Sequence, residues 1–135
     1  MNSAQAHTGS HFAAGIIYQD EDGIRYYLVI EYNSGDGTQI KFPGGTNNDH
    51  PGEEMITTLK REVEEETGLV VTGFHLVHEK PVSGHLKHFY LIPFDECEGT
   101  LRTEWKTDDG DKLSPPFWKT SDELQADVAV GGLFW

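Results

Sequence analysis

Near its middle the chain reads Arg61-Glu62-Val63-Glu64-Glu65-Glu66-Thr67-Gly68-Leu69. Three of these carboxylates, Glu62, Glu65 and Glu66, are three and four residues apart, which places them on one face of a helix. Like charges that lie about 5–6 Å apart at Cβ repel each other and destabilise an isolated helix. A hard divalent cation with oxygen ligands would offset this repulsion. The run therefore predicts a metal site on a helix.

The predicted helix has a start, an end and an apolar face. Pro51 favours the first helical turn, and Gly68 directly after Thr67 is typical of a left-handed C-cap. The apolar stripe of the helix consists of Ile56, Leu59 and Val63, with Met55 near its edge. Such a stripe packs against a sheet, so the three carboxylates should lie at the rim of the packed surface.

Short apolar and aromatic runs, bounded by glycine, proline and polar residues, predict strands on both sides of this helix. The predicted strands are Phe12–Tyr18, Arg25–Tyr32, Gln39–Phe42, Leu69–Val77, His85–Phe94 and Thr100–Trp105. Loops are predicted at residues 19–23, 33–37, 46–50 and 108–116. Ser121 caps a second helix that should run to about Val130. This order predicts a mixed α/β layer architecture, with a flexible tail at residues 1–11 and a single domain at residues 12–135.

The composition favours a globular domain with an acidic surface. Hydrophobic residues make up 36% of the chain, and the formal net charge is -13. A chain this acidic should repel nucleic-acid polymers and anionic membranes, so a phosphate ligand would need a bridging cation. The single cysteine, Cys97, excludes an internal disulfide. No apolar run approaches the roughly 18 residues that span a bilayer, and no secretory signal is apparent, so we expect a soluble cytoplasmic protein.

Together with Glu53, eight residues before Arg61, the run of residues 61–69 resembles the signature box of the Nudix hydrolases. The preceding Phe42-Pro43-Gly44-Gly45 is similar to the turn that leads into this box. The resemblance implies an α/β/α sandwich with a mixed β-sheet. It also implies Mg²⁺- or Mn²⁺-dependent hydrolysis of a phosphoanhydride bond in a nucleoside diphosphate linked to another moiety. Examples are a nucleoside triphosphate, an oxidised nucleotide or a nucleotide sugar.

The resemblance also implies roles for individual residues. Glu62, Glu65 and Glu66 match the metal ligands of the family, and the Gly45 carbonyl matches a backbone ligand. Glu53 matches a carboxylate that orients the helix residues, commonly by pairing with the position of Arg61.

Two features depart from the family pattern. Seven residues separate Gly45 from Glu53, two more than is usual, and Thr58 replaces a small alanine inside the box. An insertion in a surface loop is energetically tolerable, and this one should reshape the mouth of the pocket.

A further carboxylate after the box is expected to complete the metal site or to act as a base. Glu104 is the first candidate, with Asp108, Asp109 and Asp111 as alternatives. The residues leave open whether Glu62 or such a loop residue activates the attacking water. The expected catalytic set is Glu53, Arg61, Glu62, Glu65 and Glu104.

Substrate contacts are expected from the scarce cations near the cleft. The candidates are Arg25, Lys41 and Lys87, together with Phe42 at the turn. Solvated surface charge is the alternative interpretation for the three cations. Tyr32, Trp105, Phe117 and Trp118 could stack on a base, although core packing is the preferred interpretation.

His75, His78, His85 and His88 suggest a zinc cluster at first sight. Their spacing fits no compact tetrahedral motif, and strand alternation puts His85 and His88 on opposite faces. Ordinary strand histidines are therefore expected. The large apolar side chains of Phe134 and Trp135 need cover, which a homodimer partner could provide.

Three functions are compatible with these features. The first is an enzyme that hydrolyses a small nucleotide-type substrate, and the second is a Nudix-like module that senses a nucleotide without cleaving it. Such sensors usually lose box carboxylates, and all of them are present here. The third is an acidic interaction domain tuned by Ca²⁺, which the lack of an EF-hand loop disfavours.

Overall fold

The computed structural model describes residues 9–35, 37–82, 85–108 and 110–125. Its strands in the first half are β1 (His11–Glu21), β2 (Ile24–Ser34), β3 (Gly37–Lys41) and β4 (Gly44–Thr46). Helix α1 (Met55–Thr67) is followed by β5 (Leu69–Val71), β6 (His75–Val82), β7 (His85–Pro93) and the short 3₁₀ helix η1 (Phe94–Glu96). The remaining elements are β8 (Cys97–Gly99), β9 (Lys106–Asp108), β10 (Asp111–Leu113), β11 (Phe117–Thr120) and α2 (Ser121–Gln125).

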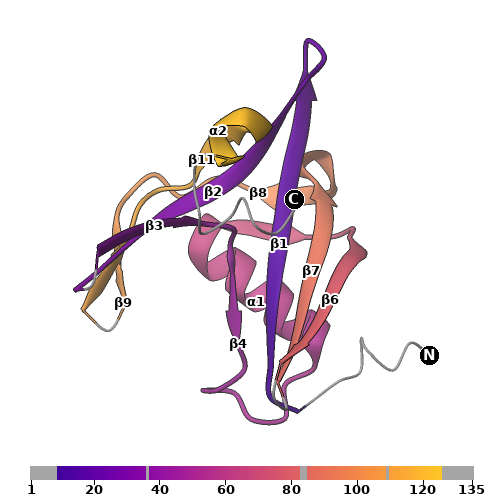
Figure 1. The fold of residues 1–135 in the computed structure, drawn as a ribbon, viewed down its shortest axis with the longest axis vertical. Coiled ribbons are helices and arrows are strands. Elements are labelled where there is room, and N and C mark those ends of the chain that lie inside the picture. The colour runs from indigo at the N-terminus through magenta and orange to yellow at the C-terminus, as the bar shows by residue number, and fades with distance from the viewer. Residues whose placement is uncertain (1–8, 36, 83–84, 109, 126–135) are drawn as a thin grey trace.

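All described strands except β5 and β8 form a mixed sheet around β1 and β2 (Figure 1), and β5 and β8 pair with each other in a separate two-stranded sheet. Its main order is β6-β7-β1-β2-β10-β9, while β3 and β11 also pair with β2 and β4 pairs with β1. Strands β1 and β7 are parallel, and the other pairs in this sheet are antiparallel. Helix α1 follows β4 in the chain and packs on β1 and β4, which brings the carboxylate-rich helix onto the sheet.

Alternate residues of β1 separate two hydrophobic clusters. Ala13 and Ile17 belong to the cluster that contains Leu59 and Val63 of α1. Ala14 and Ile16 belong to the other cluster, together with Leu124 of α2. Because successive side chains of a strand point to opposite faces, the two helices cover opposite faces of the sheet. This is the predicted α/β/α arrangement. Neither helix in the described residues is long and apolar enough to cross a membrane.

Helix α1 differs from its prediction at its start and in its buried face. Pro51 and Gly52 form a turn, and the helix begins at Met55 after an extended Glu54. Met55 is fully buried and Ile56 only partly, so the stripe is rotated from the predicted one. Buried residues recur at 55, 59, 63 and 66, which are spacings of four and three. Glu66 is therefore on the packed face, not at its rim. The predicted cap is confirmed, since Gly68 has φ 88° and donates its N–H to Glu64.

Several predicted strand boundaries were wrong because of bonds between distant residues. The predicted strand Leu69–Val77 breaks into β5 and β6, where Thr72 donates from its N–H and its hydroxyl to the Glu96 carbonyl. Residues 100–105 are irregular, and the Arg102 N–H bonds to the Thr67 carbonyl instead of a strand. Some residues of the predicted loops 33–37 and 108–116 belong instead to strands β2, β3, β9 and β10.

The chain ends differ from their predictions in one observable way. His11, which we expected in the tail, is already part of β1 and is fully buried. The predicted second helix is observed from Ser121 to Gln125, and its expected continuation to Val130 lies outside the described residues. Phe134 and Trp135 also lie outside them.

Candidate functional site

Two glycines bring the turn before the box directly against α1. Gly44 and Gly45 are paired with Ala14 and Ala13 of β1. A Cβ built on Gly45 would lie 2.4 Å from Cδ of Glu62, so the Glu62 carboxylate rests on the bare backbone of the turn. The Gly44 N–H donates to Glu66 Oε1 at 2.8 Å. The longer loop after Gly45 thus leaves the turn in contact with two of the predicted metal ligands.

Arg61 is the centre of the polar network on this side of α1. Its Nε and Nη2 donate to the two oxygens of Glu53 at 2.8 and 2.9 Å, the pairing that the resemblance implies. Its Nη1 donates to Glu62 at 2.9 Å and lies 3.4 Å from both Glu65 oxygens. Nη2 also donates to the Thr46 carbonyl at 3.1 Å. One guanidinium therefore connects the loop, the start of the helix and two of the three ligand candidates.

The carboxylates of the network have different electrostatic environments. The Arg61 guanidinium holds the pKa of Glu53 below its usual range. Burial raises the pKa of Glu62, although the bond from Arg61 opposes the shift. Burial raises the pKa of Glu66 to about 7, against the opposing effects of Lys41 and the Gly44 N–H. The Lys41 ammonium lies 3.5 Å from Glu66 Oε2.

A pocket of about 170 Å³ opens where these side chains meet. Its lining residues are Asp49, His50, Arg61, Glu62, Glu65, Glu66, Lys106 and Leu113. Four of them were not singled out from the sequence. Asp49 and His50 come from the longer loop, whose unusual length was the one available signal. Lys106 donates to the Glu65 carbonyl at 2.9 Å, at the helix end where a cation is favoured.

The donor set fits a hard divalent cation in its chemistry, since all of its side chains offer carboxylate oxygen. The bare Gly45 backbone beside Glu62 also leaves room that a side chain would fill. In the present conformation, however, no three acidic, histidine or cysteine side chains of the described residues gather closely enough to hold one ion. Arg61 and Lys41 bond to the carboxylates instead. Metal binding at this site would therefore require Arg61 and Lys41 to give up some of their bonds to the carboxylates.

Two of the predicted loop carboxylates, those of Glu104 and Asp111, do not line the pocket. Glu104 is exposed, and its carbonyl, not its carboxylate, accepts a bond from Arg102. The carboxylate of Asp111 accepts a bond from the Tyr32 hydroxyl. The side chain of Asp108 and all of Asp109 lie outside the described residues.

Of the predicted substrate contacts, only Lys41 bonds to a carboxylate of the pocket. Phe42 is 3% exposed and packs edge-to-face on Tyr27, as a core residue would. Arg25 pairs with Asp20 and lies over the Tyr18 ring. Lys87 lies over the Phe12 ring, 5.7 Å from its centroid. None of these last three residues lines the carboxylate pocket.

The four histidines occupy strands β6 and β7, as expected. His88 is fully buried and bonds to the Tyr90 hydroxyl and to Glu79, both at 2.8 Å. His78 contacts the Phe89 ring, and the His85 ring bonds to the Ser10 hydroxyl. These partners are local and structural.

The aromatic residues divide between core and surface. Trp118 packs edge-to-face on Phe94, and Phe117 is partly buried against the cluster that contains Leu124. Tyr32 lies beneath the Lys41 ammonium at 5.0 Å. The prediction of core packing was wrong for Trp105, which is 54% exposed.

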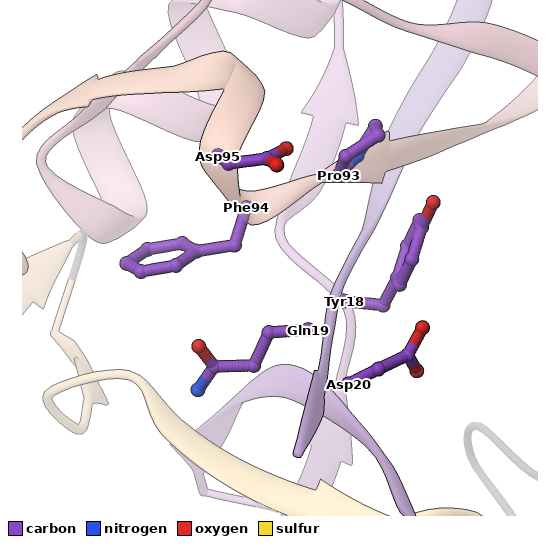
Figure 2. Close-up of a pocket in the computed structure, with 6 residues that line it drawn as sticks. All are labelled: Tyr18, Gln19, Asp20, Pro93, Phe94 and Asp95. Atoms are coloured by element: carbon purple, nitrogen blue, oxygen red, sulfur yellow. The ribbon is translucent and has the colours of Figure 1, made fainter. Parts of the chain in front are cut away.

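A larger hollow of about 350 Å³ lies at the other end of β1. Figure 2 shows the six residues that line it, Tyr18, Gln19, Asp20, Pro93, Phe94 and Asp95. Its ionisable lining consists of two carboxylates and a tyrosine, so it would repel a phosphate. Size alone is therefore a poor guide to the functional site of this molecule.

Comparison with known proteins identifies the family of the chain. The NUDIX domain family model matches residues 9–131, so the chain belongs to the Nudix family, as its box predicts. A MutT structure from work on the Aliivibrio salmonicida and Vibrio cholerae proteins is 23% identical. Its TM-score is 0.65, and the match covers 87% of this chain and 85% of that one.

Other solved structures share the fold at similar or lower identity. A MutT protein from Bacillus halodurans is 23% identical with a TM-score of 0.63, over 91% of this chain and 76% of that chain. The NUDIX domain of Shewanella oneidensis NrtR, solved with ADP ribose, is 15% identical with a TM-score of 0.62. The match covers 98% of this chain and 86% of that chain. No match was found among curated proteins. The predicted fold and family are confirmed.

Proposed function

We propose that this Nudix protein hydrolyses a phosphoanhydride bond in a nucleoside diphosphate linked to another moiety. The observation that carries the proposal is the meeting of Arg61, Glu62, Glu65 and Glu66 in one pocket, with the Gly45 backbone against Glu62. Glu62, Glu65, Glu66 and the Gly45 carbonyl would hold Mg²⁺ or Mn²⁺. When bound, such an ion would neutralise phosphate oxygens and lower the pKa of a coordinated water.

The protein's own residues would support this chemistry in two ways. Glu53 fixes the Arg61 guanidinium from one side, so Arg61 holds Glu62 and Glu65 beside the pocket. Lys106 and Arg61 place positive charge at the same pocket, where a pyrophosphate would otherwise meet only acidic groups. Each cation can therefore contribute to phosphate binding as well as to the shape of the site.

We propose Glu62 as the group that accepts the proton of the attacking water. It lines the pocket, whereas the alternative candidate Glu104 does not. A carboxylate that lines the pocket can accept a proton from a water bound there.

The test is nucleotide hydrolysis with Mg²⁺ by the wild type, Glu65→Gln and a matched control, Glu64→Gln. Both changes remove one glutamate charge from α1, but Glu64 is exposed and does not line the pocket. We expect Glu65→Gln to lower the rate by at least about 100-fold, because loss of a ligand charge displaces the ion. Glu64→Gln should retain wild-type activity. Equal rates for all three proteins would remove Glu65 from the site.

A substrate panel would separate hydrolysis from nucleotide sensing. ADP ribose deserves inclusion because the NrtR Nudix domain was solved with it, and Ap4A because a Caenorhabditis elegans Ap4A hydrolase shares the fold with a TM-score of 0.59. Calorimetric binding of any of these compounds, with Mg²⁺ and without product formation, would support the sensor in place of the hydrolase.

A further inference from the structure

His11 and Thr58 form a buried polar contact behind the pocket. His11 is the first residue of β1, Thr58 lies in the first half of α1, and both side chains are fully buried. Nε2 of His11 lies 2.6 Å from the Thr58 hydroxyl. Burying two polar groups costs free energy unless they are hydrogen-bonded. An apolar pair at these two positions would avoid this cost, so the hydrogen bond between the two side chains needs an explanation.

The hydrogen-bond directions in this contact follow from the next partner. The Thr58 hydroxyl lies 2.5 Å from Glu53 Oε1, and Glu53 is held in its ionised form by Arg61. An ionised carboxylate only accepts, so the single hydroxyl proton of Thr58 points to Glu53. The Thr58 oxygen must then accept from His11, which requires a hydrogen on Nε2. Donation thus runs from His11 to Thr58 and from Thr58 to Glu53.

Glu53 is thereby fixed from two sides. Its Oε1 accepts from Thr58 and from Arg61 Nη2, and its Oε2 accepts from Arg61 Nε. With these three bonds the carboxylate can rotate only by breaking one of them. Arg61 in turn reaches Glu62 and Glu65 with its remaining nitrogen. The orientation of Glu53 is therefore transmitted to the pocket.

The same histidine also anchors the longer loop. The His11 N–H donates to Asn47 Oδ1 at 3.0 Å, and the Asn47 N–H donates to the His11 carbonyl at 3.3 Å. Asn47 is 4% exposed and donates further to the Gly9 carbonyl. The start of β1 thus holds both the loop that supplies Asp49 and His50 and the helix that supplies the carboxylates.

We propose that His11 and Thr58 are positioning residues of the pocket, which fix Glu53 through consecutive hydrogen bonds and so hold Arg61 against Glu62 and Glu65. Neither side chain lines the pocket, so both act through Glu53. The kinetic role of the pair rests on the proposed hydrolase function, whereas the bond geometry does not.

The kinetic test compares Thr58→Val, Thr58→Ser and the control Thr57→Val. Valine keeps the volume of Thr58 without its hydroxyl, serine keeps the hydroxyl, and Thr57 is exposed on the same helix turn. We expect Thr58→Val to lower kcat about 10- to 100-fold with little change in KM, as for other residues that orient a site through a partner. Thr58→Ser should recover most of the loss, and Thr57→Val should match the wild type. Wild-type kcat in folded Thr58→Val, or equal impairment of the serine variant, would overturn the proposal.

A spectroscopic test does not depend on turnover. Long-range ¹H–¹⁵N spectra should show His11 with hydrogen on Nε2, its signals being assigned by their loss in His11→Gln. The Arg61 Nε–H signal should exchange with water at least about tenfold faster in Thr58→Val than in Thr57→Val, because Glu53 then lacks the bond from position 58 and is held by Arg61 alone. The proposal would be overturned if His11 carried no hydrogen on Nε2, or if the Arg61 Nε–H exchanged with water at the same rate in both variants. If the wild type hydrolyses no nucleotide, the proposed function fails. The spectra would still test the consecutive hydrogen bonds from His11 through Thr58 to Glu53.

Discussion

Two arginines of this molecule bond to a carboxylate with nearly the same geometry but in different surroundings. Arg61 contacts Glu53 at 2.8 and 2.9 Å, and Arg25 contacts Asp20 at 2.8 and 3.1 Å. The side chains of the first pair are 19% and 9% exposed, whereas those of the second are 40% and 53% exposed. In the first pair Arg61 lines the pocket, whereas the second pair lies near the tip of the β1–β2 hairpin (Figure 1).

The difference indicates that burial and further hydrogen-bond partners, and not the two-bond geometry between arginine and carboxylate, decide how much such a pair contributes to stability and to the site. Arg61 has additional bonds to Glu62 and to the Thr46 carbonyl, so moving it disturbs three segments of the chain. The hydrogen bonds that the Arg25 side chain donates go to Asp20, and its guanidinium lies over the Tyr18 ring. Water can replace its partners at little cost. The following predictions test this contrast.

The largest effect is expected for Arg61→Ala. It would leave Glu53 and Glu62 without their cation in a largely buried network, which should cost about 3 kcal/mol in the free energy of unfolding. Hydrolysis should fall by more than about 100-fold, since the pocket carboxylates lose their orientation. Urea denaturation of Arg61→Ala, Glu53→Ala and the double variant would give the coupling energy. A coupling near zero would mean that the buried pair behaves like a surface pair.

Part of this site could be predicted from local sequence. The helix, its Gly68 cap and the common face of Glu62 and Glu65 follow from helical spacing, which depends only on neighbours in the chain. The burial of Glu66 also follows from spacing once Met55 is recognised as the first buried residue. The predicted stripe placed Met55 at its edge and Ile56 within it, and that phase put Glu66 at the rim.

Other features depend on contacts between residues that are far apart in sequence. The break after Val71 requires Glu96 as a partner for Thr72, 24 positions away. The location of Arg25 depends on the β1–β2 register. From Ala13, which pairs with Gly45, to Asp20 the strand runs for about 23 Å. No local pattern could assign Arg25 to the hairpin tip instead of the cleft.

The second prediction concerns pH and the buried Glu66. Its pKa is about 7 in the folded protein and 4.5 in the reference state, so between these values the folded state binds more protons than the unfolded one. The metal-free protein should therefore lose stability from this group as the pH rises through that range, by about 2 kcal/mol. Glu66→Gln should lack this loss. The measurement is chemical denaturation with a chelator at about pH 5 and about pH 8.

The sign of this effect distinguishes Glu66 from Glu53. The pKa of Glu53 is lowered by Arg61, so its contribution is present above its unfolded pKa and is lost as the pH falls. Identical pH dependences for the wild type and Glu66→Gln would contradict the burial of an unfavourable charge at position 66.

The third prediction uses the bare backbone at Gly45. The added Cβ of Gly45→Ala would meet the Glu62 carboxylate, the mobile end of a long side chain, which can rotate away. Stability should therefore change by less than about 1 kcal/mol, while kcat/KM should fall at least about tenfold because Glu62 is displaced. Gly35→Ala is the matched control, since nothing lies within 4 Å of its Cβ position. Wild-type activity of Gly45→Ala would show that the position of Glu62 is not critical.

The smallest effect is expected at the hairpin tip. Arg25→Ala, Asp20→Ala and the double variant should have the same denaturation midpoint within error, and added salt should not separate them, because water screens both groups. Nucleotide hydrolysis by Arg25→Ala should match the wild type, since Arg25 lies away from the carboxylate pocket. A raised KM for Arg25→Ala would instead make Arg25 a substrate contact, as the sequence first indicated. The substrate would then have to extend from the pocket toward the hairpin, along a strand that runs for about 23 Å between Ala13 and Asp20.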